Sequence, residues 1–154
     1  MKRAMCIGLI FLGAASLLPA QDAQKILETF RRNFAIASLD VKIQILQDAA
    51  TGKTASAMGP LFQQAVDFVT DNASLIPTDA RFNQLGAIAA EQIGVVGYAP
   101  ARDSVWKLFT VTRDSVTLAK AAGALAVVGV GDVDTVINLN RFVDSARPSG
   151  SRRR

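Results

Sequence analysis

Two short stretches place reactive side chains at spacings known from enzymes. Residues 51–54 read TGKT, like the end of a phosphate-binding loop, but Gln47 occupies the position of that loop's first glycine and no strand precedes it. Ser104 and Lys107 have the Ser-x-x-Lys spacing of penicillin-recognising serine enzymes, without the partner motifs Ser-Asp-Asn and Lys-Thr-Gly. We interpret the first stretch as a turn between helices and the second as side chains on a solvent-facing helix.

The carboxylates and thiols offer no better candidate for chemistry. Asp132 and Asp134 resemble the start of a calcium loop, but the further oxygen ligands and the closing Glu do not follow. Histidine is absent, and the single cysteine is Cys6. This composition excludes disulfides and His-containing metal sites from the rest of the chain. We predict no catalytic, cofactor-binding or metal-binding residue, and therefore a protein that is not an enzyme and uses no cofactor.

Partner binding is the remaining use for exposed side chains. Trp106 is the single tryptophan, a residue type favoured at binding hot spots, although it could equally close a packed interface. Arg31 and Arg32 form, with Lys25, a basic stretch that could contact an acidic partner or anionic lipid. The same holds for a basic cluster at the chain end, made of Arg152, Arg153 and Arg154. The alternative for both is a solvated surface.

The net charge of +4 is a property of the two ends of the chain. Five of the 17 Lys and Arg residues lie within residues 1–3 and 152–154, so residues 4–151 carry a charge of −1. Proteins that read nucleic acids usually carry positive charge on one folded face. The nearly neutral body therefore argues against nucleic-acid binding.

Residues 1–20 have the order of a secretory signal peptide. Lys2 and Arg3 precede an apolar run over residues 7–18, which is shorter than the roughly 18 residues that a membrane-spanning helix needs. Pro19 should break a helix, and Ala20 is the small residue expected before a cleavage site. We predict cleavage between Ala20 and Gln21, with Ala23/Gln24 as second choice. An uncleaved anchor is the alternative.

Export without disulfides is typical of a bacterial envelope, so we expect a periplasmic or cell-envelope location. Cys6 precedes the apolar run, which is the wrong position for lipidation. Domain organisation follows as a signal peptide over 1–20, one folded domain over 21–145 and a disordered basic tail over 146–154.

Apolar residues after Gln21 recur at helical steps of three and four almost throughout, and no segment alternates as a strand would. Half of the chain is hydrophobic but only 6% is aromatic, a balance that suits close helix packing. The sequence predicts an all-α fold. Its seven helices are expected at residues 23–37, 40–50, 58–71, 79–95, 101–111, 114–129 and 132–145.

An aspartate stands before three of these helices. Asp40, Asp79 and Asp114 are spaced by 39 and 35 residues, and each could accept hydrogen bonds from unpaired N–H groups of a first helical turn. Asp103 and Asp132 lie near the starts of two further helices. A period in the thirties built from two helices is typical of an α-solenoid of antiparallel helix pairs.

Two segments carry a family resemblance. AAEQIGVVGYAPARDSVWKLF over 89–109 and AAGALAVVGVGDVDTVINLNRF over 121–142 resemble the junctions between HEAT repeats, in which an Ala-rich helix ends in a small-residue turn, often with Gly-Asp. The resemblance covers residues 79–143 well and 22–75 weakly, and the proline expected after Asp132 is absent. The rival TPR pattern of Trp, Leu, Gly and Tyr is missing.

The resemblance implies a short helical stack that binds other proteins. We therefore expect an exported HEAT-like repeat protein that acts as an adaptor or scaffold in the bacterial cell envelope. The alternative is a peripheral membrane-associated subunit of an envelope complex, held by its basic ends. The sequence leaves the partner and the oligomeric state open.

Overall fold

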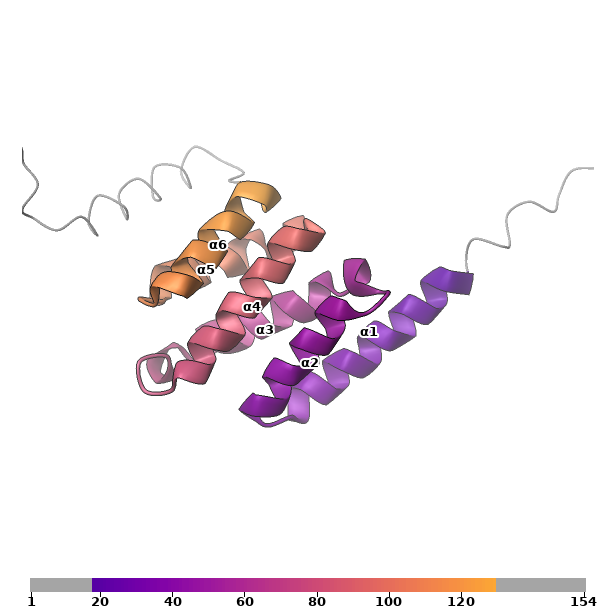
Figure 1. Cartoon of the computed structure of the whole chain (residues 1–154), viewed down its shortest axis with the longest axis horizontal. Coiled ribbons are helices and arrows are strands. Elements are labelled where there is room, and N and C mark those ends of the chain that lie inside the picture. The colour runs from indigo at the N-terminus through magenta and orange to yellow at the C-terminus, as the bar shows by residue number, and fades with distance from the viewer. Residues whose placement is uncertain (1–17, 130–154) are drawn as a thin grey trace, which may run out of the picture.

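A computed structural model describes residues 18–129, with side chains from residue 21 onward (Figure 1). Helices are the only regular elements within this range, which confirms the all-α prediction there. None of these helices is both long and apolar enough to span a bilayer. The α-helices are α1 Leu18–Ile36, α2 Leu39–Thr51, α3 Gly59–Asp71, α4 Ala80–Val96, α5 Arg102–Val111 and α6 Ser115–Val128.

These six helices follow six of the seven predicted ranges to within about two residues at most boundaries. The largest difference is the start of α1 at Leu18, which places Pro19 in the first turn. A proline is tolerated there because the N–H that it lacks would have no partner within the helix. The preferred cleavage site after Ala20 thus lies inside α1, and cleavage stays a prediction. The predicted helix over 132–145 and the predicted tail over 146–154 lie outside the described residues.

The helices are arranged in two layers. Odd-numbered helices pack in the order α1, α3, α5, and even-numbered helices pack in the order α2, α4, α6 (Figure 1). Each odd helix also packs on the even helix that follows it in the chain. Short turns connect the helices, among them the single-turn 3-10 helices η1 Ala55–Ala57, η2 Ala73–Leu75 and η3 Ala99–Ala101. Helix α4 is central because it contacts α2, α3 and α6.

The core lies between the two layers. Its fully buried side chains come mainly from α3, α4 and α5, among them Leu61, Phe62, Leu85, Ile93 and Leu108. The side of the core toward the N-terminus is aromatic: Phe68 meets the edge of Phe34 with ring centres 6.1 Å apart and stacks on Phe82 at 5.8 Å. These contacts join α1, α3 and α4. Aromatic pairs of this kind add about 0.5–1.5 kcal/mol each beyond the area that they bury.

Small residues let α4 and α6 approach closely. A Cβ atom added at Gly94 would lie 3.1 Å from the Cα of Ala124 on α6. One added at Gly86 would lie 3.5 Å from the methyl group of Thr117 on α6 and 3.2 Å from a methyl group of Leu108 on α5. Helix α4 ends after Val96 because Gly97 adopts φ 64°, a left-handed conformation that favours glycine. The Ala-rich and Gly-rich pattern of the sequence therefore marks a packing surface.

Two of the three predicted capping aspartates do cap a helix. The Asp79 side chain accepts a hydrogen bond from the backbone N–H of Arg81, and the Asp114 side chain accepts one from that of Thr117. The prediction for Asp40 is wrong, because α2 begins one residue earlier and Ser38 occupies the cap position. Asp40 instead lies in the first turn, where its carboxylate pairs with Arg81 of α4 at 2.9 Å.

Among the described residues, Lys42 is the only buried residue with a charged side chain, and it lies at the C-terminal end of α1. Its ammonium donates to the backbone carbonyl oxygens of Phe34 and Ala37, the latter at 2.9 Å. The same ammonium lies 4.7 Å from the ring centre of Phe34 and 4.9 Å from that of Phe68. Burial lowers the pKa of Lys42. The carbonyls of a helix C-terminus need such a donor where water is excluded.

Glycine substitutions test the close approach. Gly94→Ala should lower the free energy of unfolding, since forcing α4 away from the Ala124 backbone costs about 1–3 kcal/mol and outweighs the gain in helix propensity. Gly123→Ala in α6 meets no atom within 4 Å and should raise that free energy by about 0.5–1 kcal/mol. Urea unfolding of the two variants measures the difference. Equal effects would show that α4 and α6 are not in tight contact.

Replacing Lys42 tests its role as a donor to the end of α1. Lys42→Met keeps the apolar stem and removes the ammonium, so the unfolding free energy should fall by about 1–3 kcal/mol as the carbonyls lose their donor. Lys53→Met changes an exposed lysine in the turn after α2 and should stay within about 0.5 kcal/mol of the parent protein. A Lys42 variant as stable as the Lys53 variant would contradict this role.

Candidate binding groove between α4 and α6

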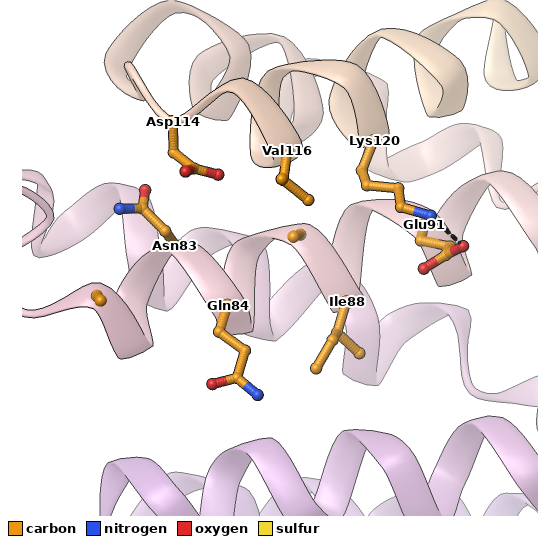
Figure 2. A pocket seen from close by; sticks show the side chains of 9 residues that line it. Asn83, Gln84, Ile88, Glu91, Asp114, Val116 and Lys120 are labelled. Carbon is orange, nitrogen blue, oxygen red and sulfur yellow. Dashed lines mark hydrogen bonds and ion pairs between the residues drawn. The ribbon is translucent and has the colours of Figure 1, made fainter.

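An open groove of about 410 Å³ runs between α4 and α6 on the outer side of the even-numbered layer (Figure 2). Its walls are formed by Ala80, Asn83, Gln84, Ala87, Ile88, Glu91, Asp114, Val116 and Lys120. The α4 residues recur at helical steps of three and four, so they form one continuous face. This face spans about 16 Å at the rise of an α-helix.

The middle of the groove is apolar. Ala87 of α4 and Val116 of α6 line it, and Val116 is 58% exposed. The half-buried Ile88 and the exposed Gln84 form the outer lip on α4, where their side chains extend away from α6 (Figure 2). An exposed valine and a half-buried isoleucine next to small alanines leave room for an apolar partner surface.

An ion pair crosses one end of the groove. The Lys120 ammonium of α6 lies 2.5 Å from a carboxylate oxygen of Glu91 on α4 (Figure 2). Both side chains are about two-fifths exposed, at 40% and 44%. An exposed pair contributes at most about 1 kcal/mol to stability. It links the two walls of the groove at this end.

A buried polar cluster holds the other end together. The Thr112 hydroxyl donates to the side-chain oxygen of Asn83 at 3.2 Å, and the Thr117 hydroxyl lies 3.1 Å from the Asn83 carbonyl oxygen. Asp114 accepts from the N–H and the hydroxyl of Thr117, both at 2.8 Å and both on Oδ2. Thr112 and Thr117 are fully buried. Satisfied polar clusters of this kind fix one relative position of their helices.

These hydrogen bonds keep a negative charge at this end of the groove. The N–H and then the hydroxyl of Thr117 stabilise the carboxylate form, so they lower the pKa of Asp114. The backbone N–H of Val116 adds to this effect. Asp114 projects toward the groove from the start of α6 (Figure 2). The groove thus has an anionic carboxylate at one end and a neutralised pair at the other.

The residues predicted from the sequence to bind a partner lie elsewhere. Arg31 and Arg32 line a separate recess of about 340 Å³ with Glu28 of α1 and Gln64 of α3. Arg31 donates to the Gln64 side chain at 3.0 Å. Trp106 of α5 is half-buried and stacks on Phe109 at 5.7 Å, which favours the packing role weighed for it. Residues 152–154, with their three arginines, lie outside the described part of the chain.

The two enzyme-like stretches are occupied by structural contacts. Thr51 ends α2 and Gly52 follows as its cap, so TGKT is part of an inter-helix turn, as interpreted. The Ser104 hydroxyl accepts from the Gln63 side chain at 3.4 Å, while the Lys107 ammonium pairs with Asp71 at 3.0 Å. Across residues 18–129 no group of three or more metal-binding side chains is present.

Sequence reasoning missed Asn83, Thr112 and Thr117, the polar side chains that join α4 to α6. One signal existed: Asn83 and Thr117 interrupt apolar stretches at positions that helical spacing directs inward. Buried polar side chains need partners, so such interruptions indicate a cluster. The sequence does not show which distant residues would complete it.

Acid titration tests the charge state of Asp114. The pKa of Asp114 in the folded protein lies below the unfolded value of about 3.9. The carboxylate therefore stabilises the fold fully when the pH is above the unfolded pKa, and this stabilisation is lost as the pH falls through the folded pKa. The unfolding free energy of the parent protein minus that of Asp114→Asn should therefore shrink on acidification below about pH 4. Urea unfolding between neutral pH and strong acid measures it. A difference that stays constant would contradict the shift.

No protein-family model, curated protein or solved structure matches this chain. The HEAT-like resemblance over residues 79–143 therefore stays a prediction that rests on the sequence pattern. The two-layer arrangement of six helices is what the structure establishes for residues 18–129.

Proposed function

We propose that this protein is an exported, non-enzymatic helical-repeat adaptor that binds another protein through the groove between α4 and α6. The observation that carries the proposal is the groove itself, with an apolar middle and charged ends on two helices in close contact. It lies within residues 80–120, the part of the chain that resembles HEAT repeats. Stacked helix pairs commonly bind partners on such extended surfaces.

The rigidity of the walls supports a binding role. The polar cluster around Asn83 fixes one end and the Glu91–Lys120 pair crosses the other. A preformed surface avoids the entropy cost of ordering side chains on binding, which is about 0.5–1.5 kcal/mol for each mobile side chain. The order of residues 1–20 supports export, and a bacterial envelope is the compartment that fits it.

A second candidate function is a peripheral membrane subunit held by its basic ends. The observation that favours it is the exposure of Arg31 and Arg32 on α1, next to a recess. Glu28 shares this recess and reduces its positive charge, and Arg31 already binds Gln64. We therefore rank it below the adaptor.

Photo-crosslinking in cells tests the adaptor proposal. A photoreactive amino acid in place of Gln84 in the groove should crosslink to one partner protein, and the same group in place of the exposed Gln47 on α2 should not. Ala87→Arg fills the groove with a long charged side chain and should reduce the crosslink by about tenfold or more. Ala99→Arg, on the exposed turn η3, is the matched control and should leave it unchanged.

Three outcomes would count against the adaptor. Equal crosslinking from both positions would remove the groove as the site. Turnover of a small substrate by the purified protein would make it an enzyme. Sedimentation with anionic vesicles that is lost on deleting residues 152–154 would favour the membrane subunit.

A further inference from the structure

The backbone of the groove walls limits what can bind there. Both walls are α-helices, whose N–H and C=O groups are paired within each helix except at the ends. An extended peptide lying in the groove would lose hydrogen bonds to water and find no ladder of backbone partners in return. A helical segment brings its own backbone hydrogen bonds and presents only side chains. The groove therefore favours a helix as occupant.

The length and composition of the groove set the kind of helix. The α4 face from Ala80 to Glu91 matches about three helical turns. Ala87 and Val116 at its centre require apolar side chains on one face of the partner, and Ala80 and Ala87 allow close approach. Gln84, on the lip, has a side-chain amide available for a polar residue beside that face.

The charges set the direction of the helix. Asp114 presents a carboxylate at the end of the groove where α4 and α6 begin, and a helix N-terminus carries partial positive charge. A partner helix antiparallel to α4 and α6 would place its negative C-terminal end there. Basic side chains are favoured in the last turn of a helix, and here they would also meet Asp114.

We propose that the occupant is an amphipathic helix of a partner protein, about three turns long, antiparallel to α4 and α6, with a Lys or Arg in its last turn against Asp114. This inference rests on the adaptor function and names the kind of partner for the same groove. The apolar face of the helix covers Ala87 and Val116. Its first turn lies at the Glu91–Lys120 pair, where an acidic side chain can share the Lys120 ammonium.

A displayed library of 14-residue helical peptides, selected on the full-length protein, provides the probe. Enriched peptides should carry apolar residues at helical spacing and Lys or Arg near the C-terminus. Fluorescence anisotropy then measures the Kd of one enriched peptide. Ala87→Arg should abolish its binding and Ala99→Arg should not.

Two matched variants isolate the charge. Asp114→Asn and Asp79→Asn both retain a side chain that caps well, but only Asp114 lines the groove. Asp114→Asn should weaken binding about three- to tenfold in low salt and by less in high salt, whereas Asp79→Asn should stay within about twofold. A peptide with Gln in place of its terminal Lys or Arg should bind both variants and the parent protein equally.

The outcomes separate this inference from the adaptor function. If Ala87→Arg prevents peptide binding but Asp114→Asn leaves it unchanged, the proposed basic residue of the partner helix is wrong. The groove would still be a binding site. Peptides indifferent to Ala87→Arg, or no enriched peptide at all, would overturn both proposals. Self-association that Ala87→Arg abolishes would identify a second copy of this chain as the occupant and overturn the partner helix.

Discussion

The close contact between α4 and α6 is the constraint on which the second half of the structure depends. Gly94 allows the Ala124 backbone to approach, and Gly86 leaves room beside the methyl group of Thr117. Near the start of both helices, the Asn83 side chain accepts from the hydroxyl of Thr112 in the turn before α6, and the Asn83 backbone carbonyl lies 3.1 Å from the hydroxyl of Thr117. Steric contact at one end and hydrogen bonds at the other define a single relative position of the two helices.

The groove is a consequence of that position. The helices touch at Gly94 and Ala124, and the groove lies beside this contact, between residues 80–91 of α4 and residues 114–120 at the start of α6. The cap of α6 contributes to both stability and surface chemistry, since Asp114 accepts hydrogen bonds from Thr117 and also lines the groove. Packing, capping and binding surface thus share the same few residues.

The N-terminal part of the stack is held by different interactions. Phe34, Phe68 and Phe82 link three helices through ring contacts, and the Lys42 ammonium lies between two of these rings and the end of α1. Among the described residues, this half lacks the close Gly–Ala contact of the other half. Aromatic and cationic contacts take the place of small-residue packing there.

The sequence by itself determined the helices and most of their boundaries, because apolar spacing and caps such as Asp79 act within a few residues of chain. It also showed that the enzyme-like motifs were incomplete. It misassigned Asp40, since the helix starts one residue earlier than predicted and Ser38 occupies the cap position without a side-chain hydrogen bond. Hydrophobic spacing alone carried no information on the groove.

Only the tertiary structure decided which distant side chains meet. Glu91 pairs with Lys120, and Asn83 binds Thr112, because two helices lie at one particular separation and rotation. That geometry results from the sum of many packing contacts along α4 and α6, and no local stretch of sequence encodes it. The sequence shows the chemistry of the individual residues, whereas only the packed helices show that these residues line a common groove.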